Sequence, residues 1–304
     1  MTTTSRAILL VVVADVWWGI SAIYWNELDD LDSIDQLGWR IVLGLATLSV
    51  YWIARRTFPF AGTTGRHVRF AMAGALAISG NWAVFLWAGA NGQAVEAALG
   101  YFLMPIISVA LALKVLGERL RRAQVVAVLL ALVGIVWLFA SRGGVPWVAL
   151  VLGFSFASYG LLRKVGPWGA LDGLTAEMTV VAPIGAILLL TGVASGRSVD
   201  GGGGATNWLL ISITGLVTTL PLFLFANAAR KAPLVVVGLL QYVIPVAQFL
   251  VGWLWLGESV DRSRLFGFGF IWAALGFVVA DQVGSGRAGA VSEGPVDRLE
   301  PRLE

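Results

Sequence analysis

Ten apolar stretches, each near the length of about 20 residues that a helix needs to cross a bilayer, dominate this sequence. They fall near residues 5–25, 36–54, 68–90, 97–116, 123–140, 146–163, 174–193, 206–227, 234–256 and 263–281. Backbone groups inside lipid must satisfy one another, so only helices or a closed barrel can span it. The stretches lack the alternating polarity of barrel strands. We therefore expect an all-α membrane protein with ten transmembrane helices.

Composition agrees with this class. The chain is 58% hydrophobic and 13% charged, whereas soluble domains have about 25% charged residues. The first stretch resembles a signal peptide because Arg6 precedes it, but Asp15 interrupts it and no small-residue cleavage site follows. We expect it to be retained as the first helix. The absence of Cys excludes disulfides and thiolate metal sites.

The basic residues predict the orientation. If the N-terminus is inside, 16 of the 21 Lys and Arg residues lie on the inner side and four on the outer side, with Arg40 left inside the second span. Inner loops of membrane proteins carry the excess of Lys and Arg. The sequence thus predicts an inner-membrane, multi-pass protein with both termini in the cytoplasm. Because these basic residues lie in short loops, we expect no nucleic-acid partner.

A segment from Pro105 to Glu118 recurs 140 residues later, from Pro245 to Glu258, and both copies close with Leu-Gly-Glu. Fixed-period repetition indicates a duplicated architecture. Each Pro lies 12 residues before its Gly, about 18 Å along a helix, so we expect both near mid-membrane as matching bends. Each Gly-Glu pair is interpreted as a helix end and tight turn, with Glu at the positive end of the next helix.

The offset maps the first five helices onto the last five. Because five is odd, the second copy enters the membrane in the opposite sense. We predict residues 1–141 as the first repeat, 142–283 as the second, inverted repeat, and the polar residues 284–304 as a disordered cytoplasmic tail. Inverted repeats around a midplane site are typical of secondary transporters.

Long ordered motifs also resemble a known family. They include GNWAVFLWAGANGQAVEAALGYFLMPI, LGERLRRAQ, SFASYGLLRK, TTLPLFLFANAARKAPLVVVGLLQYVIP and FIWAALGFVVAD. Together they resemble the RarD branch of the EamA family, in the drug/metabolite transporter superfamily, over about residues 14–281. The resemblance implies ten helices with inner termini and a substrate path between the halves. Where relatives usually have His-Arg and an Asn, this chain has Trp39-Arg40 and Met104, so a role of that His in proton coupling does not transfer.

Charged residues inside a bilayer are costly and point to function. Asp15, in the middle of the first span, is a candidate cation or proton site, or alternatively a structural carboxylate bonded to a neighbouring helix. Arg40 and Glu96 lie near the outer ends of their spans, where they could pair with each other, or Arg40 could hold a substrate carboxylate. Glu177 is expected to pair with Arg163 or Lys164.

A set of polar and aromatic residues completes the predicted substrate site. Its alternative interpretation is ordinary hydrogen bonding between helices, at about 0.6 kcal/mol per bond. With the charged candidates, the predicted substrate-binding residues are Asp15, Trp18, Arg40, Asn81, Trp82, Phe85, Glu96, Tyr101, Ser108, Tyr159, Thr218, Gln241, Tyr242 and Gln248.

No nucleophile elbow, metalloprotease His pair or phosphate loop is present, so we expect neither an enzyme nor a cofactor or metal. The sequence favours a permease for a small amphipathic metabolite or drug, driven by an ion or substrate gradient. A sensor or assembly protein that kept the fold without transport is the alternative. Substrate, direction, coupling ion and the choice between monomer and homodimer stay open.

Overall fold

The structure is a computed structural model that describes residues 3–57, 59–60, 62–140, 147–255, 257 and 262–292. Those residues form helices and no strand. The helices are α1 (Thr3–Asn26), α2 (Ser33–Arg55), α3 (Gly65–Ala90), α4 (Ala94–Leu116), α5 (Arg122–Ala140), α6 (Trp147–Val165), α7 (Ala170–Ala194), α8 (Gly204–Lys231), α9 (Leu234–Leu240), α10 (Val243–Leu250) and α11 (Arg262–Ser292).

Ten spans are long and apolar enough to cross a membrane, which confirms the predicted fold class. The ninth, Leu234–Trp255, consists of α9, α10 and a π-helical turn, Val251–Trp255. Large apolar side chains along the spans face outward, including Ile53, Leu76 and Leu254, each at least 70% exposed. Lipid solvates such side chains, so a surface of this kind suits a bilayer and not water.

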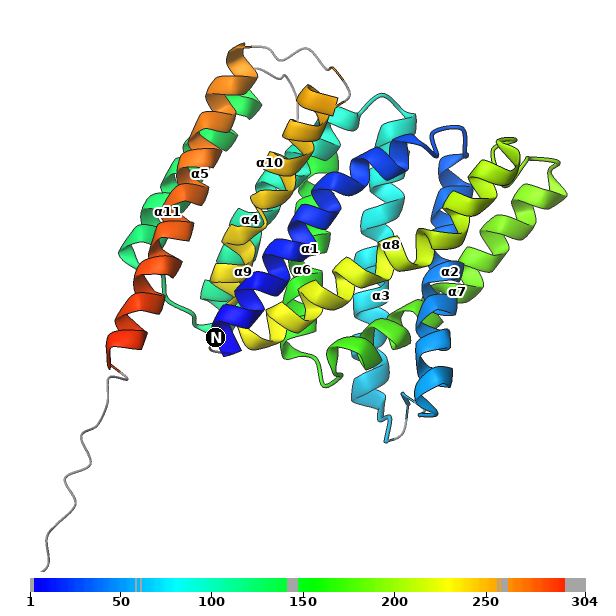
Figure 1. Cartoon of the computed structure of the whole chain (residues 1–304), viewed down its shortest axis with the longest axis horizontal. Coiled ribbons are helices and arrows are strands. Elements are labelled where there is room, and N and C mark those ends of the chain that lie inside the picture. Colours follow the sequence, from blue (N-terminus) through cyan, green and yellow to red (C-terminus); the bar gives the residue numbers. More distant parts are fainter. Residues whose placement is uncertain are drawn as a thin grey trace, which may run out of the picture.

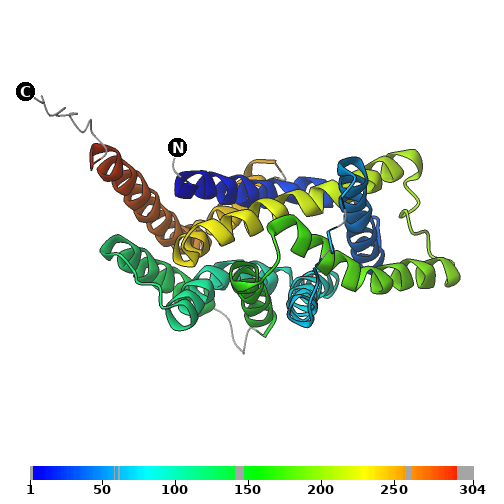
Figure 2. The same cartoon turned by 90° about the horizontal axis from the view of Figure 1, so that it is seen from below.

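The helices form two layers (Figure 2), one containing α1, α8 and α11 and the other containing α3, α4, α5 and α6. Helices α5 and α11 pair at one end of the molecule, and α2 and α7 pair at the other (Figure 1). Between these ends α1 packs on α8 and α10, while α6 packs on α3 and α4. Under the predicted repeat, α6 corresponds to α1 and α3 to α8, so the two sets of contacts are equivalent.

Glycines allow the end helices to approach closely. A Cβ on Gly38 of α2 would lie 2.8 Å from Leu189 Cγ, and one on Gly185 of α7 would lie 2.8 Å from Ile41 Cβ. Small residues at helix crossings are how membrane helices gain packing without a hydrophobic driving force. The α2–α7 contact therefore depends on these two glycines.

The helix assignment differs at the two repeated prolines, and the bends at both stay a prediction. Helix α4 runs without interruption through Pro105, whereas the ninth span breaks at Gln241 and Tyr242, ahead of Pro245. At the break Ile244 N donates to Gln241 O at 3.1 Å, a shorter-range bond than that of an α-helix. The ring of Pro245 displaces that carbonyl, and the β-branched Val243 and Ile244 have lower helix propensity than the residues before Pro105.

Helix α11 continues beyond the predicted end of the tenth span, so residues 284–292 of the predicted tail are helical. Residues 293–304 lie outside the described residues, as does the predicted repeat boundary at 141–142. The face of the bundle on which α1 begins, lower in Figure 1, is called the N side below. Helices α3, α5, α7 and α9 also begin on the N side.

Candidate functional site

Asp15 lies halfway along α1 and is fully buried. Neither of its carboxylate oxygens has a hydrogen-bond partner. The structural alternative for Asp15, a carboxylate bonded to a neighbouring helix, is therefore not what the structure shows. A buried carboxylate without a donor is costly and needs an explanation.

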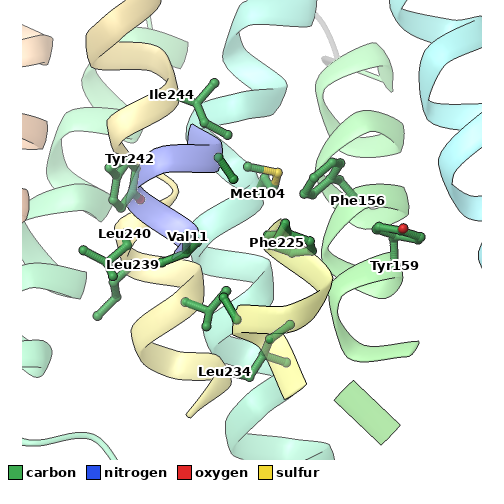
Figure 3. Close-up of a cluster of buried hydrophobic side chains, with 14 of the residues drawn as sticks. Val11, Met104, Phe156, Tyr159, Phe225, Leu234, Leu239, Leu240, Tyr242 and Ile244 are labelled. Atoms are coloured by element: carbon green, nitrogen blue, oxygen red, sulfur yellow. The ribbon is translucent and has the colours of Figure 1, made fainter. Parts of the chain in front are cut away.

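The face of α1 that carries Asp15 packs on the broken ninth span. Residues 11, 15 and 19 share one face, because positions four apart align on a helix. Val11 lies beside the segment with Leu239 and Tyr242 (Figure 3). A Cβ on Gly19 would lie 3.3 Å from Ile244 O. Asp15, between Val11 and Gly19, thus faces the region where α9 ends and α10 begins.

Other predicted polar residues gather at this depth. Tyr242 is fully buried, and its hydroxyl has no partner; the same holds for the Thr218 hydroxyl near the middle of α8. Ser108 of α4 donates to Gln241 Oε1 at 3.3 Å. Gln248 is half-buried in α10. The middle of the molecule therefore holds buried polar groups with unused hydrogen-bonding capacity.

Aromatic rings from α1, α6 and α8 pack on one another in the same region. Trp18 contacts Phe156 edge-on at a centroid distance of 5.4 Å and Phe225 at 5.8 Å. Tyr159 stacks on Phe225 at 6.3 Å, with 15° between the rings. Figure 3 shows Phe156, Tyr159 and Phe225 from α6 and α8 within the buried cluster. Two predicted site residues, Trp18 and Tyr159, thus belong to one aromatic contact network.

Tyr159 also belongs to a buried polar cluster on the N side. Its hydroxyl donates to Glu177 Oε2 at 3.1 Å, and Arg163 Nη1 donates to Glu177 Oε1 at 3.1 Å. Arg163 Nη2 further donates to the carbonyls of Gly169 and Ala170. The prediction that Glu177 pairs with Arg163 or Lys164 is confirmed, and the partner is Arg163. Tyr159 and Arg163 of α6 therefore both bind Glu177 of α7, and Tyr159 helps to join these two helices.

Lys164 instead binds Glu118, with 3.7 Å between Nζ and Oε1. Glu118 also accepts hydrogen bonds from the N–H groups of Leu234 and Val235, both at 2.8 Å. Its carboxylate therefore caps α9, and not the next helix α5 as the sequence suggested. Helix N-termini attract anions because their first N–H groups are unsatisfied. Glu258, the repeat equivalent of Glu118, lies outside the described residues.

Arg40 lies on the other side of the bundle, among aromatic rings. Its guanidinium carbon is 4.2 Å from the ring centroid of Trp25 and 5.0 Å from that of Trp82. No ion pair within 4.0 Å joins Arg40 to Glu96 in the described residues. The predicted pair with Glu96 is absent because two indoles hold the guanidinium instead. Trp25 could not be selected from the sequence, since no spacing pattern connects it to Arg40.

The remaining predicted residues lie near Arg40 or on the adjoining helices. Phe85 contacts Tyr101 at a centroid distance of 5.8 Å, and both are half-buried. Asn81 donates to Leu152 O at 3.0 Å and to Ser155 Oγ at 2.9 Å. Asn81 therefore links α3 to α6, in keeping with the alternative of interhelical bonding. Glu96 Oε2 is buried without a partner in the first turn of α4.

On the side opposite the N side, an ion pair joins α2 to the loop after α7, and no spacing in the sequence indicates it. Asp35, fully buried in the first turn of α2, accepts two hydrogen bonds from Arg197, at 3.1 and 3.0 Å. This bonding raises the pKa of the Arg197 guanidinium, which lies in the loop after α7. The pair connects α2 to the end of α7, next to their glycine contact.

A separate groove does not coincide with the predicted site. It has a volume of about 640 Å³ and lies between α2 and α3, with Ile34, Leu37, Val84 and Trp87 among its lining. None of the predicted site residues lines it. Within the part of the chain that the structure describes, no three His, Cys, Asp or Glu side chains are grouped as metal ligands.

Comparison with known proteins agrees with the fold. The model of the EamA-like transporter family matches the chain twice, at residues 5–140 and 144–280. A solved crystal structure with 17% sequence identity superposes with a TM-score of 0.70, covering 90% of this chain and 96% of the other. That structure supports the fold alone.

Relatives of known name extend over nearly the whole chain. Protein RarD of Streptomyces exfoliatus is 40% identical, covering 89% of this chain and 87% of the relative. The uncharacterized transporter YojE of Bacillus subtilis is 34% identical, with 92% and 95% covered. Protein RarD of Escherichia coli is 34% identical, with 92% and 96% covered. With two family matches and these relatives, the chain belongs to the EamA-like transporter family and is a multi-pass membrane protein.

Proposed function

We propose that this protein is a secondary transporter of the inner membrane that moves a small amphipathic metabolite or drug. Transport occurs by alternating access at a midplane cavity between two inverted repeats. One observation carries the proposal: Asp15, buried without a partner, faces the break between α9 and α10. Secondary transporters typically place substrate and ion sites where a broken helix meets the repeat interface. Membership of a transporter family supports the same conclusion.

Asp15 suits a proton-coupled cycle. An isolated charge inside a bilayer costs roughly 2.5–3.5 kcal/mol on insertion scales, and a carboxyl group without donors avoids that cost by holding a proton. We infer that Asp15 carries a proton in this state and releases it when the cavity opens to the other side. Tyr242 and Thr218, whose hydroxyls are also unpartnered at this depth, supply further groups for a substrate or water.

Contacts between helices on the N side support alternating access. Three sets of contacts join helices there: the aromatic network around Phe225, the Arg163–Glu177 pair, and the Glu118 cap of α9 with Lys164. A cavity that opened to the N side would have to separate some of them. The excess of Lys and Arg on that side supports a cytoplasmic N side.

Metabolite profiling tests the proposal. Medium and cell extracts are compared between a deletion strain and the same strain that produces the wild type, Asp15→Asn or Asp15→Glu. We expect the wild type to move at least one small metabolite between cells and medium, and Asp15→Asn to abolish that movement. Asp15→Glu keeps an ionisable group, so it should retain part of the flux.

Asp29→Asn is the matched control, because Asp29 is an exposed acid in the loop after α1. Its flux should equal that of the wild type, and immunoblots of membranes should show equal amounts of all variants. Identical metabolite profiles with and without the wild type would contradict a permease. Binding of a cytosolic partner without any flux would favour the sensor or assembly protein.

A further inference from the structure

Arg40 lies in an aromatic setting formed at one depth by several helices. It is seven residues from the start of α2, Tyr101 is seven from the start of α4, and Trp82 is eight from the end of α3. These spacings equal about 10–12 Å along each axis. Trp25 comes from the last turn of α1. The guanidinium is thus held well inside the side opposite the N side, with Arg40 only 8% exposed.

The charge of Arg40 has no anionic partner. No carboxylate lies within 4.0 Å of its nitrogen atoms in the described residues, and its Nε–H has no hydrogen-bond partner. The other deeply buried arginine, Arg163, has Glu177 at 3.1 Å and two backbone carbonyls. The Nε–H group is unpartnered in both arginines, so the difference is the counter-charge: Arg163 is neutralised by Glu177, whereas Arg40 contacts the rings of Trp25 and Trp82.

Indole rings hold a cation but do not replace an acceptor. A cation–π contact contributes about 0.5–2 kcal/mol, while the N–H groups of the guanidinium still need oxygen atoms. Arg presents these donors in a planar fork that matches the two oxygens of a carboxylate. The group that Arg40 lacks is accordingly a planar oxyanion.

On the basis of the proposed transport function, we propose that Arg40 is the binding site for the carboxylate of an anionic substrate with a flat apolar body. Trp25 and Trp82 orient the guanidinium, and Phe85 and Tyr101 receive the apolar body. Their rings contact each other at 5.8 Å, and both side chains are half-buried.

Matched acid and amide probes test this assignment. The purified full-length protein in lipid nanodiscs is titrated with phenylacetate and phenylacetamide, and with indole-3-acetate and indole-3-acetamide, by calorimetry and thermal unfolding. Each acid should bind at least about tenfold more tightly than its amide, because only the acid forms charge-assisted bonds to Arg40. Equal affinity within the pairs, or no binding of either acid at millimolar concentration, would overturn the proposal.

Variants locate the effect. Arg40→Gln should remove the preference for acids, and Arg40→Lys should retain part of it, because Lys keeps the charge but loses the fork. Arg69→Gln, at an exposed position near the start of α3, should leave the preference unchanged. A preference that persists in Arg40→Gln would overturn the assignment. If that variant does not fold, Arg40→Lys and the wild-type acid–amide comparison still decide.

Lipid is the other source of an oxyanion. Titrations in nanodiscs of phosphatidylcholine alone are repeated with phosphatidylglycerol added. Unchanged acid binding supports a soluble substrate, and loss of acid binding would assign Arg40 to a lipid head group. Arg40-dependent acid binding without flux would retain the site and refute the permease. Flux of neutral metabolites that is unaffected by Arg40→Gln would support the permease and refute the carboxylate site at Arg40.

Discussion

The two buried arginines show how single side chains in this protein divide between stability and binding. Arg163 is neutralised by Glu177, whose other oxygen accepts from Tyr159, so both oxygens of this carboxylate already hold a donor. Arg40 and Asp15 lack such partners. Sequence alone located all of these residues but could not separate the roles, because the separation depends on contacts between distant helices.

Glu177→Ala should destabilise the protein strongly. The substitution leaves Arg163 buried without its counter-charge, a loss of roughly 3–5 kcal/mol in comparable sites. Tyr159→Phe removes a single hydrogen bond and should cost about 1 kcal/mol. The purified variants are heated, and the folded protein that remains at each temperature is measured by size-exclusion chromatography. The resulting Tm values give the order of stability. Glu27→Ala, at an exposed position after α1, is the control, and equal Tm values for Glu177→Ala and this control would contradict the prediction.

Among the helices, the ninth span departs most from what its sequence suggests. The repeat predicted the same behaviour at Pro105 and Pro245, since both follow the same pattern of apolar residues. The structure breaks only the second helix and supports its first part, α9, by the Glu118 cap. A break depends on neighbouring elements as well as on Pro, so helix number was predictable from apolar length while helix continuity was not.

Glu118→Ala should loosen α9 selectively. The two N–H groups of Leu234 and Val235 lose their acceptor, and loss of a helix cap costs about 0.5–2 kcal/mol. Hydrogen exchange measured by mass spectrometry should become faster in peptides that cover 234–240 and stay unchanged in α3. Lys164→Gln is the matched variant, because it leaves both cap bonds in place while it removes the ion pair and the bonds from Lys164 to Ala229 O and Ala232 O. Unchanged exchange in α9 of Glu118→Ala would show that the cap contributes nothing.

The fold class and the family of the whole protein were the most predictable properties. Ten spans followed from the length of the apolar stretches, and the family followed from ordered motifs. The site was less predictable, because Trp25 contacts Arg40 only after α1 and α2 pack, and Asp15 faces a break that the sequence did not indicate. Long-range packing determines such pairs, and apolar periodicity reports only which segments enter the bilayer.

Cysteine labelling tests the orientation of the bundle. The chain contains no Cys, so single substitutions at exposed loop positions give an unambiguous signal. Ser195→Cys should react with a membrane-impermeant maleimide on intact spheroplasts, whereas Thr63→Cys should react only after permeabilisation. Both residues are exposed, on opposite sides of the bundle. Labelling of Thr63→Cys alone in intact spheroplasts would reverse the predicted topology.

The pairing of helices across the two repeats also has a consequence for synthesis. The partners of α1, α2 and α5 include α8, α7 and α11, which the ribosome makes later. Once the first five helices have been inserted, much of their final contact surface still faces lipid or the insertion machinery. The first half cannot mature as a unit ahead of the second. Tertiary assembly of this transporter must therefore wait until α11 has been released into the bilayer.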